Sequence, residues 1–161
     1  MTFQPNPRLV IRFIDEPDLI SRAITFVTDS LWCHTECLSR DGSGWVGAHA
    51  GTGVEKRALD WVRPSRERVY AIPVKPDAFN AAHNFLESQM GCKYNYRDIL
   101  GLFFHRRIWS PQRVICSQLM LQFMQEAGLQ PLNVLPDYSA LITPETLHLS
   151  PLFIGRSIKL P

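Results

Sequence analysis

The chain has 161 residues, of which 45% are hydrophobic and 20% are charged, and its net charge is +2. This composition is typical of one globular domain with a hydrophobic core, and it excludes a disordered chain. The near balance of 17 basic and 15 acidic residues gives no electrostatic reason to expect a nucleic-acid partner. We find neither an apolar run long enough to cross a bilayer nor a secretory signal pattern, so we expect cytoplasmic synthesis, no membrane insertion and reduced cysteines.

Runs of β-branched and apolar residues bounded by turn residues predict strands. These strands are residues 8–14, 32–39, 45–50 and 66–74, with a less regular extended segment leading into 58–62. The turn-rich sequence 40–44 lies between the second and third strands, which indicates a β-hairpin.

Apolar residues at helical spacing predict helices between and after these strands. The predicted helices are 16–30, 76–90, 94–107, a helix within 111–128 and a short helix at "TPETL" (143–147). Pro76 is typical of a helix start, and Gly128 is typical of a helix end. Because there are no internal repeats or linkers, we expect one α+β domain over residues 1–161.

The stretch "LWCHTECLSR" (31–40) concentrates residues with reactive side chains. In a strand, His34 and Glu36 point to one face, while Cys33 and Cys37 point to the other. This alternation argues against all four binding one ion, and the Cys-x-x-x-Cys spacing is not that of a structural zinc site. We therefore predict no metal site here, and we expect the two cysteines to be small buried hydrophobic residues.

A second reactive residue, Cys116, lies in "VICSQLMLQF", where a predicted helix begins at or near the cysteine. Backbone N–H groups and the helix dipole stabilise a thiolate at a helix N-terminus, and the same N–H groups can hold an oxyanion. A histidine on an adjacent strand, such as His34, would complete a thiolate–imidazolium pair for acyl transfer. The alternative is that Cys116 is an inert buried cysteine.

The order of these motifs resembles that of the permuted NlpC-type, papain-like cysteine amidases, the YiiX-like group. The resemblance rests on Cys33-His34-Thr35-Glu36, on "G-x-x-Y-x-x-x-x-I-L-G" at 91–101, and on Cys116-Ser117-Gln118-Leu119. It extends over about residues 8–151, and the histidine motif precedes the cysteine helix as in the permuted group. It implies a circularly permuted papain-like fold in which an antiparallel sheet packs against helices.

By this resemblance Cys116 is the nucleophile and His34 is the general base. The third residue, which orients the imidazole, is either Glu36 or His49. We prefer Glu36, because a carboxylate stabilises an imidazolium more directly than a second imidazole does. The resemblance also makes Tyr94 and Ser117 candidates for the pocket or the oxyanion hole. The expected reaction needs no cofactor.

The resemblance implies a cysteine amidase or peptidase that cleaves amide bonds in peptidoglycan stem peptides. The nearest variants we expect are phage or prophage proteins, in which case the chain would be carried in a virion beside other phage structural proteins. One alternative is a structural tail or baseplate component that keeps the fold without the chemistry. Another is an acyltransferase or thioesterase that acts on lipid, and a metal-dependent hydrolase ranks last.

The remaining polar and aromatic residues carry weaker signals. His83 and His105 lie in predicted helices and are expected to be packing or surface residues. Asp137, Tyr138 and His148 lie in a proline-rich tail that could border the cleft. The tryptophans expected in the core or the cleft wall are Trp32, Trp45 and Trp61.

Overall fold

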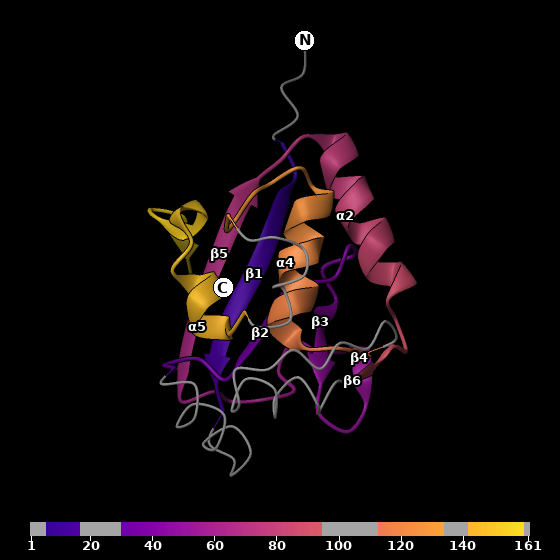
Figure 1. Cartoon of the computed structure of the whole chain (residues 1–161), viewed down its shortest axis with the longest axis vertical. Coiled ribbons are helices and arrows are strands. Elements are labelled where there is room, and N and C mark those ends of the chain that lie inside the picture. The colour runs from indigo at the N-terminus through magenta and orange to yellow at the C-terminus, as the bar shows by residue number, and fades with distance from the viewer. Residues whose placement is uncertain (1–5, 17–29, 95–112, 134–141, 160–161) are drawn as a thin grey trace.

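The computed structural model describes residues 6–16, 30–94, 113–133 and 142–159. Within these residues the protein is an α+β structure built on a six-stranded antiparallel sheet with helices packed against it, as predicted (Figure 1). None of the described helices is both long and apolar enough to cross a membrane.

The large sheet has the strand order β4-β3-β2-β1-β5-β8. Its strands are β1 (Arg8–Asp15), β2 (His34–Leu38), β3 (Gly44–His49), β4 (Gly53–Ala58), β5 (Arg66–Pro73) and β8 (Ser157–Ile158). The four predicted strands and the predicted hairpin are therefore confirmed, and the extended segment before residue 58 forms β4. A second, parallel pair joins β6 (Lys93–Tyr94) to β7 (Arg113–Val114).

The described helices are α2 (Pro76–Ser88), α4 (Cys116–Glu126) and α5 (Pro144–His148), followed by the 3-10 turn η2 (Pro151–Phe153). Helix α4 lies across one face of the sheet, against β2 and β3, and contacts both α2 and α5 (Figure 1). The helix predicted over 16–30 lies almost entirely outside the described residues. The same holds for 94–107, except that Tyr94 belongs to strand β6 and not to a helix.

The hydrophobic core lies between α4 and the sheet. One face of β1 contributes Leu9, Ile11 and Phe13, which are fully buried in the same cluster as most of α4. Most of the residues of α4 are buried, as expected for a helix whose apolar residues are not confined to one stripe. This packing fixes the direction in which the N-terminus of α4 points.

Helix α4 has different capping at its two ends. At the C-terminal end Gly128 has φ +72°, and the N–H groups of Gly128 and Leu129 bond to carbonyls of the last turn, which is a Schellman motif. At the N-terminal end Ile115 precedes Cys116 and provides no side-chain cap. The backbone N–H groups of the first turn are therefore left to a group other than a capping side chain.

Candidate active site

Three adjacent strands supply the candidate site. In the β1–β2 ladder Arg12 pairs with Glu36. In the β2–β3 ladder Leu38 pairs with Trp45. Extending this antiparallel register along both strands places Gly47 opposite Glu36 and His49 opposite His34. The imidazole rings of these two histidines lie with their centroids 4.7 Å apart, in agreement with that register.

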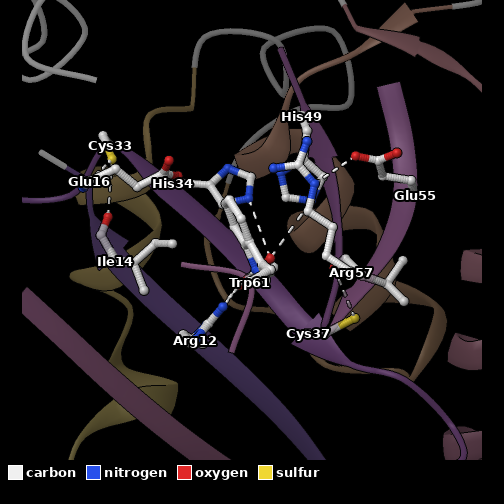
Figure 2. A network of polar contacts seen from close by, with 12 residues as sticks. Arg12, Ile14, Glu16, Cys33, His34, Cys37, His49, Glu55, Arg57 and Trp61 are labelled. Carbon is white, nitrogen blue, oxygen red and sulfur yellow. Dashed lines mark hydrogen bonds and ion pairs between the residues drawn. The ribbon is translucent and has the colours of Figure 1, made fainter. Parts of the chain in front are cut away.

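Glu36 is the centre of the site and is fully buried. Its Oε1 atom accepts hydrogen bonds from Nε of Arg12 at 2.7 Å, from Nη2 of the same guanidinium, and from Nε1 of Trp61 at 3.3 Å. Its Oε2 atom faces two imidazoles, at 3.6 Å from Nε2 of His34 and 3.8 Å from Nε2 of His49. The rings of these two histidines lie side by side in Figure 2. One oxygen therefore anchors the carboxylate, and the other serves the histidines.

Gly47 provides the space in which these side chains meet. A Cβ atom added at this position would lie 3.0 Å from Nε2 of His34 and 3.0 Å from Cβ of Glu36. Such contacts are closer than real Cβ atoms normally make, so a side chain here would displace the imidazole or the carboxylate.

Cys116 is the first residue of α4, as predicted, and is 4% exposed. Its thiol interacts with the His34 side chain, which is 7% exposed, through a hydrogen bond and through charge. His34 thus contacts the thiol of α4 and the carboxylate of β2. Because its Nε2 faces Glu36, Nδ1 is the ring nitrogen that remains for Cys116.

The electrostatics of the three ionisable side chains in the sheet follow from this arrangement. Burial by itself lowers the pKa of His34, but Cys116 and Glu36 outweigh burial and raise it to about 10. Burial opposes ionisation of Glu36, yet His34 and Arg12 lower its pKa to about 2. Burial, then the charges of His34 and Arg57, lower the pKa of His49 to about 3. At neutral pH Glu36 is therefore ionised and His49 is neutral.

Aromatic side chains and a further ion pair hold the two arginines of the site. The guanidinium carbon of Arg12 lies 4.2 Å from the centroid of Trp45, and Nη1 of Arg12 lies 3.1 Å from Oε1 of Glu67. The guanidinium carbon of Arg57 lies 4.4 Å from the ring centroid of Trp61. These contacts restrict the Arg12 guanidinium and the Trp61 indole, which are the two groups that donate to Oε1 of Glu36.

Tyr94 and Ser117, the two candidates for the pocket or oxyanion hole, both lie near the start of α4. Ser117 is the second residue of the helix, and the strand partner of Tyr94 lies just before the helix. Tyr94 is 8% exposed, belongs to the main core cluster, and pairs with Val114 in the β6–β7 ladder. The Ser117 hydroxyl is fully buried and donates to the carbonyl of Ile142. It therefore joins α4 to the segment before α5.

Other candidate residues lie in packing positions. His83 is buried and packs against Phe79 and Phe123, as predicted. His148 pairs with the hydroxyl of Tyr70 at 2.8 Å within an aromatic cluster. None of the four cysteines, all of which lie in the described residues, forms a disulfide, and those at 33 and 37 are buried, as predicted. The candidates that lie outside the described residues are His105, Asp137 and Tyr138.

Two residues of the site, Arg12 and Gly47, are not among the candidates predicted from the sequence. Trp61 is expected there in the core or the cleft wall, and its hydrogen bond to Glu36 was not predicted. The metal-ligand pattern was considered only within residues 31–40, so the grouping of His34 and Glu36 with His49 was missed.

Comparison with known proteins identifies a similar fold. No family model matches the sequence, and no curated protein matches it. A solved structure, described as that of the metalloprotein yiiX from Escherichia coli O157:H7, of the DUF1105 group, matches with a TM-score of 0.65. The two chains are 17% identical, and the match covers 93% of this chain and 95% of that one. The fold is therefore YiiX-like over nearly the whole chain.

Proposed function

We propose that the protein is a cysteine hydrolase that cleaves amide bonds, with Cys116 as nucleophile, His34 as acid and base, and Glu36 as the residue that orients His34. The observation that carries the proposal is the position of the His34 ring, which contacts the thiol at the N-terminus of α4 and lies 3.6 Å from the Glu36 carboxylate. A nucleophile, a base and a third group that orients the base are the minimum set for acyl transfer.

The reaction would proceed in two stages. In the first, the Cys116 thiolate attacks the amide carbonyl carbon, a C–S bond forms, and the carbonyl π-electron pair moves to oxygen. Backbone N–H groups of the first turn of α4 stabilise this oxyanion, since Ile115 provides no side-chain cap for them. The tetrahedral intermediate collapses, the C–N bond breaks, and protonated His34 gives its proton to the departing amine.

In the second stage neutral His34 accepts a proton from a water molecule, which attacks the thioester carbonyl. The C–S bond then breaks, the carboxylic acid leaves, and the proton held by His34 restores the thiolate–imidazolium pair. Glu36 serves both stages, because its charge stabilises the imidazolium each time it forms. Glu36 fits this role better than His49, whose neutral ring faces Glu36 at 3.8 Å and lies across the β2–β3 pair.

The substrate class comes from the family resemblance of the motifs, which favours stem peptides of peptidoglycan. A phage particle that delivers such an enzyme to the cell wall is the setting that we propose. The competing proposals are a structural phage component with an idle site and an acyltransferase or thioesterase.

The test is to incubate the purified full-length chain with peptidoglycan fragments and with a synthetic stem peptide, and to measure newly formed amines. Cys116→Ala and His34→Ala should each remove the release of amines, while Cys92→Ser, which alters a half-buried cysteine of the β4–β6 region, should retain it. Intact-protein mass spectrometry should detect an acyl adduct on Cys116 when hydrolysis is slow. Activity that persists in the Cys116 and His34 variants would refute the mechanism, and inactivity of the wild type on every amide, ester and lipid substrate would favour an idle structural site.

A further inference from the structure

Three buried polar atoms of the site face one another without a hydrogen-bond partner among the described residues. They are Nε2 of His34, Nε2 of His49 and Oε2 of Glu36. Each of the three residues offers one ligand atom within 4.8 Å of those of the other two, and Oε2 of Glu36 is 3.6 and 3.8 Å from the two Nε2 atoms. Buried polar atoms are almost always satisfied in proteins, so this convergence favours a bound group that contacts all three.

The neutral His49 imidazole, the His34 imidazole once it has released its Nε2 proton, and one carboxylate oxygen form a donor set that suits a borderline divalent ion, Zn²⁺ above all. A tetrahedral ion with ligands at about 2.0–2.1 Å separates neighbouring ligand atoms by about 3.4 Å. The observed distances of 3.6 and 3.8 Å exceed this value by a few tenths of an ångström. The ligand atoms of the two histidines lie within 4.8 Å of each other, so binding would draw the two imidazoles together around the ion. Ca²⁺ and Mg²⁺ fit poorly, because they prefer more oxygen ligands.

We propose that His34, Glu36 and His49 bind one Zn²⁺-like ion, and that this ion switches off the thiol chemistry of Cys116. The inhibitory part rests on the proposed hydrolase function, whereas the binding part does not.

The surroundings of the three ligands support an ion site. Of the two carboxylate oxygens of Glu36, Arg12 and Trp61 bind Oε1 and leave Oε2. They therefore hold the carboxylate in place while Oε2 is directed at the histidines. Such partners behind a ligand orient it and strengthen metal binding. Gly47 leaves open the space next to His34 Nε2 that any larger residue would fill. The ligands themselves are at most 7% exposed, so an ion here would be held away from bulk water.

Ion binding and hydrolysis would exclude each other because both need the single basic lone pair of the His34 imidazole. A metal on Nε2 of His34 leaves Nδ1 carrying a proton, so this nitrogen cannot accept the proton of Cys116. The ion also neutralises Oε2 of Glu36, which would otherwise stabilise the imidazolium. Removal of the ion restores both groups, so the site would act as a reversible inhibitory switch.

Cys116 is not one of the grouped ligands, which allows the two proposals to be tested separately. The binding experiment uses the full-length Cys116→Ala chain, stripped of metal by a chelator and titrated with Zn²⁺ in a calorimeter. We expect one ion per chain. Replacing Zn²⁺ by Co²⁺ should give the intense visible absorption of a four- or five-coordinate site. His49→Gln should weaken binding by at least about tenfold, whereas His83→Gln, a matched buried histidine outside the site, should bind as tightly as Cys116→Ala.

A second measurement on the unmodified wild-type chain covers the case in which a variant fails to fold. Long-range ¹H–¹⁵N correlation spectra of the histidine rings should show that Zn²⁺ shifts the Nε2 signals of two histidines and leaves the other three unchanged. No binding at one equivalent of Zn²⁺, equal affinity in His49→Gln, or shifts at other histidines would overturn the site.

The inhibitory role is then measured on the wild-type chain with the peptide substrate of the hydrolase assay. One equivalent of Zn²⁺ should reduce amine release by at least about tenfold, and a chelator should restore it. Unchanged turnover in a chain loaded with one ion would overturn the inhibitory role. A wild-type chain that binds one Zn²⁺ but hydrolyses no substrate would refute the hydrolase and its inhibition while supporting the ion site.

Discussion

Oε1 of Glu36 accepts hydrogen bonds from Arg12, whereas Oε2 faces the imidazoles of His34 and His49. The guanidinium and the two imidazoles therefore do not compete for one oxygen atom. This division follows from strand register, because Arg12 pairs with Glu36 across β1 and β2, while His49 lies on β3. A fully buried carboxylate beside one imidazolium and one neutral imidazole would cost more to ionise than one that a guanidinium also binds.

Replacing Arg12 by leucine should therefore destabilise the protein by about 3 kcal/mol, because it removes the cation that hydrogen-bonds to Oε1 of the buried Glu36 and leaves only the His34 imidazolium beside that carboxylate. The double variant Arg12→Leu/Glu36→Leu should recover most of that loss, since both charges are removed, but it should not recover hydrolysis. Glu67→Gln is the matched control, since this half-exposed partner of Arg12 contributes little. Denaturant unfolding measures all three, and a double variant no more stable than Arg12→Leu would contradict the expectation.

Gly47→Ala tests the space between the strands. The added methyl group would press on Nε2 of His34, so we expect amide hydrolysis to fall by about tenfold or more while the chain stays folded. Gly91→Ala serves as the control for stability. Its Cβ would meet no atom within 4 Å, but its φ of +81° makes the substitution strained. Turnover in Gly47→Ala equal to that in Gly91→Ala would mean that position 47 does not position the imidazole.

Thiol reactivity distinguishes a working nucleophile from a buried structural cysteine. With iodoacetamide, Cys116 should be modified faster than the other cysteines, because its thiol lies at the start of α4 and contacts the His34 side chain. His34→Ala should slow this modification by roughly tenfold or more. Peptide mass spectrometry identifies the modified residue. The half-buried Cys92 is the internal reference, and faster modification of that thiol would count against a catalytic Cys116.

The parts of the fold that local sequence encodes were predictable. Alternation placed His34 and Glu36 on one face of a strand, and helical spacing placed Cys116 at the start of a helix. Both patterns depend only on neighbours along the chain. Tyr94 shows the limit of such patterns, because its strand exists only through pairing with a segment that begins at Arg113. No periodicity within residues 94–107 signals that pairing.

The contributions of Arg12, Gly47 and His49 depend on which strands are neighbours and in what register. An isolated arginine in an apolar strand was the available signal for Arg12, since a charge there requires a buried partner. Trp61 lies after β4 in irregular backbone, so only the tertiary structure determines that its indole reaches Glu36. The spacing of possible metal ligands within one strand does not reveal His34, Glu36 and His49 as a group, because these residues converge from two strands.

His83 provides a pH-dependence that is independent of the candidate active site. Burial, and then the charge of Arg40, lower its pKa from 6.5 to about 4, although Glu87 opposes this shift. Above pH 6.5 the histidine is neutral in both the folded and the unfolded chain, so its contribution to stability is fully present. Between pH 6.5 and 4 the unfolded chain binds the proton and the folded chain does not, so stability falls as the pH falls.

We expect the wild type to lose about 2–3 kcal/mol more of its unfolding free energy than His83→Leu does between pH 7.5 and 4. Leucine fills the position between Phe79 and Phe123 without titrating. Urea unfolding at several pH values gives both curves. The comparison rests on the difference in slope, so a constant offset from repacking does not affect it. Parallel curves would show that His83 is protonated in the folded protein as easily as in the unfolded chain, contrary to its burial.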